Sequence, residues 1–280
     1  VGSEMCIRDR NENIIDELTK MVNETKYDSI YNIVSTLIIV MDIFKNVVTM
    51  ELLNVKWEWL KNIIRTLPYT EKKIKAIQGD ARNTGLKDNT ADLLITSPPY
   101  INVLNYHQKY RRSVEALGYD VLKLAKSEVG ANRKNRGNRF LTVIQYCMDM
   151  ALSIKEAIRV CKNESRMIYV VGRESTVLGC SFCNSKLVYE IATKIFDLDI
   201  TLKQERVFKN RFGTMIYEDI LHFKNSKEMQ NITEDEIIFK AQQIAVAMLK
   251  EKKPEERNKE SLKEAIEFAS KVKKSEVAYA

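Results

Sequence analysis

The residues best suited to chemistry form one corner of the chain, where the apolar run Leu93 to Thr96 passes directly into Ser97-Pro98-Pro99-Tyr100. Two consecutive prolines fix φ near about −65° and remove two backbone N–H groups, so the corner presents one hydroxyl and several carbonyl oxygens. This surface accepts hydrogen bonds, and the tyrosine adds a flat ring beside it. The corner therefore suits a planar group that carries an NH₂, such as a purine or pyrimidine with an exocyclic amine.

An exocyclic amine is a poor nucleophile because its lone pair is delocalised into the ring. Acceptors at Ser97 Oγ and the Pro98 carbonyl would bind its two N–H bonds and draw the nitrogen toward a tetrahedral, attacking form. The base must first leave the duplex, and Tyr100 can then stack on it. A buried proline-rich turn is the alternative, but four such residues directly at the end of an apolar strand favour the functional interpretation.

Alternating strand and helix patterns surround this corner. Strands are predicted at Lys73 to Ala81, which ends in Gly79-Asp80, and at Asp92 to Thr96. Apolar residues that step by three and four from Ile144 to Cys161 predict one buried helical stripe. A buried strand at 166–172, a helix at 186–196 and a hairpin of 199–208 with 215–223 follow. We therefore expect an open α/β sheet with an antiparallel pair at its end, and ligands at the carboxyl ends of its strands.

Helical patterns flank the sheet region on both sides. Apolar residues recur at helical spacing from Ile14 to Arg65, with no glycine or proline before Pro68. Thr233 and Glu236 form a possible capping box for a helix that ends near Lys250, and a second helix is expected after the proline at 254. The first ten residues lack this periodicity and resemble translated adapter sequence.

Positive charge is concentrated after the corner. Residues 101–140 hold nine Lys or Arg against three acids, a net charge of +6, whereas the whole chain carries +7. Tyrosines are interleaved with these charges, a composition typical of a nucleic-acid surface, although a solvated loop is the alternative. The candidate DNA-binding residues are Arg111, Arg112, Arg133, Lys134, Arg136 and Arg139. Arg211, on the hairpin turn, can contact phosphate or be solvated.

Composition excludes several other classes. The chain has 280 residues, and its longest apolar run is far shorter than the roughly 18 residues of a membrane span, so we expect a soluble, cytoplasmic protein. Five cysteines without dense spacing predict reduced thiols. Cys180 and Cys183 form a single CxxC pair, and His107 and His222 are the only histidines, so no metal site is expected. His107 could face a target base, but a surface position in the basic loop is the simpler expectation.

Residues 96–100, Thr-Ser-Pro-Pro-Tyr, resemble the catalytic motif of S-adenosylmethionine-dependent DNA methyltransferases that modify exocyclic amines. The resemblance covers roughly residues 74–224 and implies that Ser97, Pro98, Pro99 and Tyr100 are catalytic. It also implies that Asp80 and Thr96 bind the cofactor, with Asp80 contacting its adenine amine. A turn or helix cap is the alternative role of Asp80.

The chain departs from this family in its cofactor half. The family has a glycine-rich F-x-G-x-G loop after its first strand and an acid after its second, but none of the nine glycines here stand two apart. We therefore expect a partial Rossmann-like methyltransferase sheet without its first two strands, carried by an N-terminally truncated chain or a naturally split subunit. The expected parts are a non-native or disordered leader at 1–10, a helical insert at 11–70, the catalytic part at 71–226 and a helical hairpin at 227–280.

The resemblance implies methyl transfer to a flipped base in double-stranded DNA, in a restriction-modification context. Serine at position 97 is the form usual in enzymes that methylate N4 of cytosine, with N6 of adenine as the alternative. A non-catalytic DNA-binding subunit is a second class, and methylation of a protein amide, which usually has asparagine in place of Ser97, is a third. The isolated chain is expected to be inactive, because the missing N-terminal half or a partner subunit would carry the glycine-rich loop.

Overall fold

The protein is described here as a computed structural model that covers residues 14–43, 45–101, 108–130, 137–225 and 232–277. It divides into two compact units. Unit 1 contains the described residues of 1–77 and 106–124, and unit 2 contains those of 78–105 and 125–280. The leader at 1–10 lies outside the described residues, and the domain boundaries predicted from the sequence stay a prediction.

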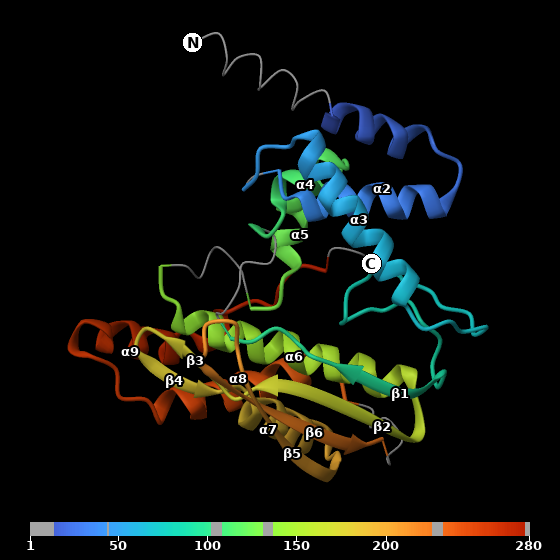
Figure 1. Cartoon of the computed structure of the whole chain (residues 1–280). Helices are drawn as coiled ribbons and strands as arrows, with labels where there is room; N and C mark the ends of the chain where they lie inside the picture. The colour runs from blue at the N-terminus through green and yellow to red at the C-terminus, as the bar shows by residue number, and fades with distance from the viewer. Residues whose placement is uncertain (1–13, 44, 102–107, 131–136, 226–231, 278–280) are drawn as a thin grey trace. The chain divides into compact units, whose positions relative to one another are not determined.

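Unit 1 is helical in its described parts (Figure 1). Residues 14–24 form a helix, followed by α2 (Asp28–Met41), α3 (Met50–Thr66) and α4 (Arg111–Ala116), and α5 (Val121–Ser127) contains a boundary between the units. Val22, Val34 and Ile38 pack into a small core. The helical region predicted from the sequence is thus confirmed, although its core is small because most of the α3 side chains remain at least partly exposed.

Unit 2 is built on a four-stranded mixed sheet with the order β1-β2-β6-β5. The strands are β1 (Ala91–Thr96), β2 (Cys161–Gly172), β5 (Asp199–Lys209) and β6 (Met215–Lys224). β1 and β2 are parallel, whereas β6 is antiparallel to both β2 and β5. These findings confirm the predicted motif strand, the buried strand and the terminal hairpin, and the mixed α/β class.

One long helix, α6 (Phe140–Val160), directly precedes β2 in the connection between the two parallel strands and is buried along most of its length. The sequence predicted one buried stripe, but α6 packs against β2, α7 (Asn184–Phe196) and α8 (Glu234–Lys250). Because neighbours contact several of its faces, polar side chains such as Gln145 and Asp149 are buried with the apolar ones. The helix is the centre of the core of unit 2.

The strand predicted at Lys73 to Ala81 is wrong. The only β feature of this segment, all of which the structure describes, is an isolated bridge between Asp80 and Asn83. Ile74 and Ile77, the large apolar residues of the predicted strand, are 78% and 64% exposed. A strand needs a neighbouring ladder for its backbone N–H and C=O groups, and no strand of the described sheet pairs with this segment.

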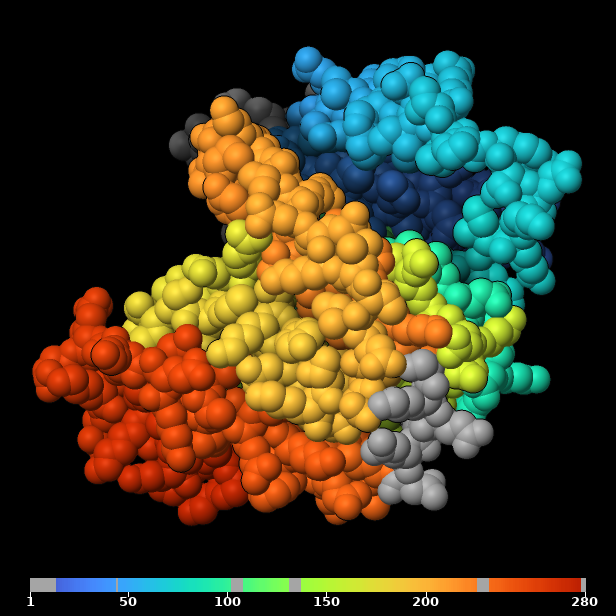
Figure 2. All heavy atoms as spheres, turned by 90° about the horizontal axis from the view of Figure 1, so that it is seen from below, coloured from blue at the N-terminus to red at the C-terminus, as the bar shows by residue number. Residues whose placement is uncertain are grey.

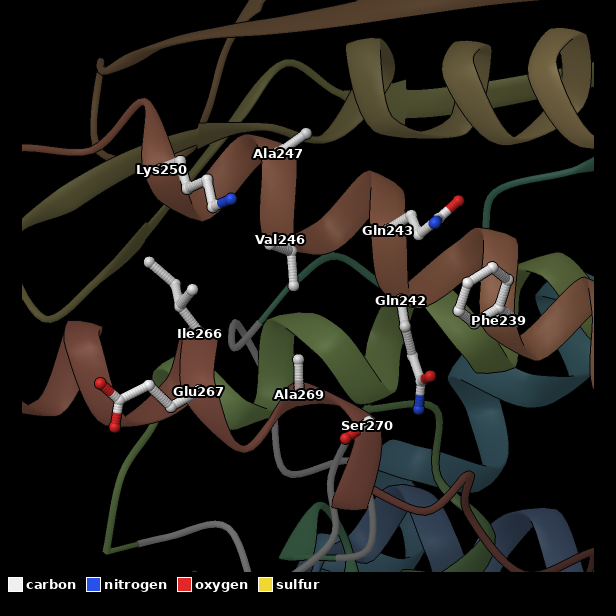
Figure 3. A pocket seen from close by; sticks show the side chains of 10 residues that line it. All are labelled: Phe239, Gln242, Gln243, Val246, Ala247, Lys250, Ile266, Glu267, Ala269 and Ser270. Carbon is white, nitrogen blue, oxygen red and sulfur yellow. The ribbon is translucent and has the colours of Figure 1, made fainter.

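The C-terminal part of unit 2 is helical, as predicted. Thr233 and Glu236 form the capping box, in which the Thr233 N–H and hydroxyl both donate to Glu236 Oε2 at 2.8 Å. α8 is followed by η3 (Glu256–Asn258), α9 (Lys259–Glu267) and η4 (Ala269–Lys271). A groove of about 470 Å³ lies between α8 and the α9–η4 segment, and it is lined by Phe239, Val246 and Ile266, among others (Figure 3).

None of the helices in the described ranges has the length and apolar content that a bilayer crossing requires. Cys180 and Cys183 are free thiols at the two ends of β4 (Cys180–Cys183), which pairs with β3 (Glu174–Val177). Across the same described ranges, no group of three or more His, Cys, Asp or Glu side chains could hold a metal ion.

The guanidinium of Arg82 joins several segments of unit 2, although its side chain is only 2% exposed. It donates to Asp80 Oδ2 at 2.6 Å and to Asp149 Oδ1 at 3.0 Å. It also donates to the carbonyl oxygens of Ser127, Ser275 and Glu276, at 2.8 to 3.2 Å. Burial opposes its charge, but the hydrogen bonds and charges of the two aspartates outweigh that effect and raise the pKa of Arg82 above its usual value.

We expect Arg82→Ala to lower the free energy of unfolding by about 3–5 kcal/mol, because it leaves two buried carboxylates without their cation. Lys194→Ala is the matched control, since the Lys194 side chain is 62% exposed and its ion pair with Glu190 at 3.0 Å should contribute at most about 1 kcal/mol. Urea unfolding followed by circular dichroism measures both. Equal losses in the two variants would contradict the structural role assigned to Arg82.

Candidate functional site

The predicted corner follows β1, at the carboxyl end of the strand. Thr96 pairs in register with Tyr169 of the parallel strand β2, so the corner lies at the edge of the sheet where β2 also ends, at Gly172. Ser97 is exposed, and Pro98, Pro99 and Tyr100 are half-buried. The chain then enters the core at Ile101, which is 1% exposed.

The helix α6 holds the corner through one hydrogen bond. The hydroxyl of Tyr146, a residue only 1% exposed, donates to the Pro99 carbonyl at 2.8 Å. The Pro99 carbonyl is therefore occupied. Within the described residues, no hydrogen bond engages Ser97 Oγ or the Pro98 carbonyl, and these are the two acceptors that the sequence singled out for an amine.

Asn184, the first residue of α7, fixes the far end of the corner. It is fully buried, and its Oδ1 accepts from the Ile101 N–H at 3.2 Å. Its Nδ2 donates to the Gly172 carbonyl at 3.1 Å and to Ser175 Oγ at 2.9 Å. One amide side chain thus joins the corner to the end of β2 and to β3. Sequence analysis did not identify this residue, because its partners are 9 to 83 positions away in the chain.

The ring of Tyr100 packs on Gly172. A Cβ atom at Gly172 would lie 2.5 Å from Tyr100 Cε2, so the ring approaches the strand only because this residue has no side chain. The Tyr100 hydroxyl donates to Glu218 Oε1 of β6 at 3.4 Å. The orientation of the ring therefore depends on β2 and β6 together.

A carboxylate, Asp219, anchors a second polar cluster beside this edge of the sheet. Its Oδ2 accepts from Ser185 Oγ at 2.5 Å, and its Oδ1 accepts from Arg173 at 3.0 Å. Burial would raise the pKa of Asp219, but these hydrogen bonds and the charge of Lys203, whose Nζ is 3.4 Å away, lower it below its usual value. The carboxylate therefore stays ionised and holds the strand end to α7. The neighbouring acids at 218 and 219, within a strand of mostly apolar residues, could have indicated this cluster from the sequence, but the sequence prediction did not include them.

Asp80, a predicted cofactor-binding residue, forms a hydrogen-bonded ion pair with Arg82. Its Oδ1 accepts from the backbone N–H and from Nε of Arg82, at 2.9 and 2.8 Å, and its side chain is 8% exposed. Thr96, the other predicted cofactor residue, lies at the end of β1. The structure thus gives Asp80 a structural partner and leaves the roles of both residues toward a cofactor a prediction.

The candidate DNA-binding residues fall in different parts of the molecule. Arg111 and Arg112 belong to α4 of unit 1, and Arg111 donates to Glu115 at 2.7 Å. Arg139 directly precedes α6 in unit 2. Arg133, Lys134, Arg136 and His107 lie outside the described residues. The predicted basic surface therefore remains a prediction.

Comparisons with known proteins give little support to any assignment of family or function. No protein-family model matches the chain, and no curated protein does either. One similar solved structure is a protein from Thermus thermophilus that is described provisionally as a DNA modification methylase, with 15% sequence identity and a TM-score of 0.30. The match covers 56% of each chain, so this protein spans just over half the length of that one. A superposition this loose identifies neither fold nor activity, and function is inferred from the residues of the site.

We expect Gly172→Ala to displace the Tyr100 ring and to lower the free energy of unfolding by about 1–3 kcal/mol, because the added methyl group overpacks the contact. Gly79→Ala is the matched control, since a Cβ atom there meets nothing within 4 Å. Urea unfolding of both variants tests the close approach. If Gly172→Ala is no less stable than Gly79→Ala, the Tyr100 ring does not pack on this strand.

Proposed function

We propose that this chain is the base-binding part of an S-adenosylmethionine-dependent DNA methyltransferase that modifies an exocyclic amine, with N4 of cytosine as the target. The supporting observation is the corner itself. Tyr146 occupies the Pro99 carbonyl, which leaves Ser97 Oγ and the Pro98 carbonyl as acceptors at the carboxyl end of a parallel strand. Two acceptors on a rigid turn match the two N–H bonds of an amine.

In this proposal the chain contributes orientation. Ser97 Oγ and the Pro98 carbonyl accept the two amine hydrogens of a flipped base, and Tyr100 stacks on the base. Holding the nitrogen in a fixed direction accounts for much of the rate, because it converts an encounter between two molecules into a reaction within one complex. No covalent intermediate with the protein is required.

The described residues do not make a complete site for the methyl donor, which would supply an electrophilic methyl group. Asp80 is bonded to Arg82 on both of its oxygens, and the chain has no glycine-rich loop. We therefore propose that another polypeptide segment, either an N-terminal half or a partner subunit, carries most of the cofactor site. Double-stranded DNA would be bound in part by Arg111, Arg112, Arg133, Lys134, Arg136 and Arg139.

The position and exposure of β1 support the proposal that another polypeptide segment completes the protein. β1 is an edge strand in the described sheet, and its Leu93 and Ile95 side chains are 50% and 65% exposed. Parallel sheets are normally covered on both faces, so a parallel edge strand with exposed apolar side chains fits the end of a larger, Rossmann-like sheet whose first two strands lie elsewhere. A restriction-modification context and a cytoplasmic location belong to the same proposal.

Two other functions are compatible with the corner. N6 of adenine presents the same NH₂ beside an acceptor nitrogen, so the corner would accept it equally. A non-catalytic DNA-binding subunit is favoured by one specific observation, the burial of Asp80 against Arg82. The two classes differ in whether the corner residues affect methylation.

We expect Ser97→Ala and Tyr100→Ala each to reduce DNA methylation by about 100-fold, because each removes a group that orients the amine. The chain is co-expressed with its adjoining coding sequence in a host without DNA methylation, and long-read sequencing then reports N4-methylcytosine and N6-methyladenine separately. Ser181→Ala and Tyr189→Ala, which alter exposed residues, are the controls. Undiminished methylation in both corner variants would exclude this corner as the catalytic site.

The isolated chain should neither bind S-adenosylmethionine tightly nor methylate DNA. A single hydrogen bond donated by the cofactor to Asp80 would contribute only about 0.5–1.5 kcal/mol, which corresponds to little affinity. Isothermal titration calorimetry of the chain, alone and with the complementing polypeptide, measures this directly. Micromolar binding by the chain alone would show that another of its segments serves as the cofactor loop.

A further inference from the structure

The hairpin of β5 and β6 carries a second concentration of positive charge. We call residues 206–217 the ribbon tip. It contains Arg206, Lys209 and Arg211 and has no acidic residue, a net charge of +3. Its atoms, gold to orange in Figure 2, form a projection on the surface of unit 2. A narrow projection with a single sign of charge is suited to a polyanion.

These charges are little neutralised by the protein. Across the described residues, Lys209 and Arg211 form no ion pair. Arg206 pairs with Glu218 at 3.6 Å, through a side chain that is 58% exposed. By contrast, Lys203 and Arg173, at the root of the hairpin, are both paired with Asp219. The charge available to a partner is therefore located at the tip.

Aromatic rings lie beside the arginines of the tip. The Arg206 guanidinium lies 4.7 Å from the centroid of the Phe208 ring, and that of Arg211 lies 4.6 Å from the Phe212 ring. Phe212 is 75% exposed, so its ring is not packed into the hairpin. Exposed rings paired with guanidinium planes are the surfaces on which unpaired bases stack.

The turn that carries these groups is ordered by its own side chain. Asn210 Oδ1 accepts from the N–H groups of Phe212 and Thr214, at 2.9 and 3.0 Å. Gly213 has φ +80°, which supplies the left-handed residue that the turn needs. Arg211 and Phe212 are thus presented by a fixed backbone, which lowers the entropy lost when a ligand binds.

The root of the hairpin contacts the predicted base site. Glu218 accepts from the Tyr100 hydroxyl and lies opposite Arg206 in the ladder of β5 and β6. The corner and the tip are therefore connected along one strand. If the base of a nucleic acid bound at Tyr100, the nucleotides that flank it would lie near the ribbon tip.

We propose that the ribbon tip is a DNA-binding surface, in which Lys209 and Arg211 bind backbone phosphates and Phe212 stacks on an unpaired base next to the target. This inference rests on the proposed function for its choice of DNA as the partner. It adds a contact surface separate from the basic segment that follows the corner. Exposed Val207 and Met215 on the same hairpin make a protein partner the competing outcome.

The test is fluorescence anisotropy of the full chain with a labelled duplex that has a single-stranded overhang, between about 0.05 and 0.2 M salt. Lys209→Ala/Arg211→Ala should reduce the slope of log affinity against log salt by about 2, because two phosphate contacts are lost. Phe212→Ala should weaken binding to the overhang DNA by at least about fivefold and affect a blunt duplex less. Lys240→Ala/Lys263→Ala, which removes two exposed lysines from α8 and α9, should leave the slope unchanged.

Thermal unfolding of each variant verifies its fold. If the wild-type chain binds DNA and the two ribbon variants match it in affinity and slope, the ribbon inference is overturned while the proposed function stands. If the ribbon variants lose DNA affinity but the corner variants keep full methylation, the proposed function fails and the ribbon inference stands. Absence of any DNA binding by the chain overturns the ribbon inference, whereas methylation by the corner variants decides the proposed function. If the ribbon variants differ from the wild-type chain in sedimentation velocity but not in DNA affinity, the tip is a protein contact and the inference is overturned.

Discussion

A buried guanidinium must be surrounded by acceptors, and the way Arg82 meets this requirement organises unit 2. Moving a charge out of water costs several kcal/mol unless partners compensate on every side. Asp80 and Asp149 supply the opposite charges, and backbone carbonyls from two further segments fill the remaining directions. These segments are far apart in the sequence, so the requirement for complete pairing holds them in one arrangement.

The helix α6, which supplies Asp149 to Arg82, also supports the corner. Tyr146 and Asp149 are three residues apart on α6, a spacing that places both on one face. Gly130 packs between them, since a Cβ atom there would lie 2.9 Å from Tyr146 Cβ, and its N–H donates to Asp149 at 3.0 Å. A shift of α6 would therefore disturb the Pro99 carbonyl and the Arg82 cluster together, which links the stability of the unit to the geometry of the site.

Patterns set by neighbouring residues were predictable. The strand at Ala91–Thr96, the corner that follows it and the capping box at Thr233 depend on local periodicity and on proline and threonine chemistry, and the structure has all three. The supports of the corner were not predictable, because Asn184 and Tyr146 act through contacts across 83 and 47 positions. The strand expected at Lys73 to Ala81 failed for a related reason. A strand-like local sequence cannot supply the neighbouring ladder that a strand requires.

The range of the Arg82 contacts also constrains the order of folding. Its guanidinium donates to carbonyl oxygens 193 and 194 positions later in the chain. During synthesis, β1 and α6 leave the ribosome long before these carbonyls exist, so the hydrogen bonds of the cation remain incomplete while the core around it condenses. Contacts of such high sequence separation slow folding, because a large loop has to close before they form. Newly made chains would therefore pass through a state with exposed apolar surface, in which demand for chaperones is greatest.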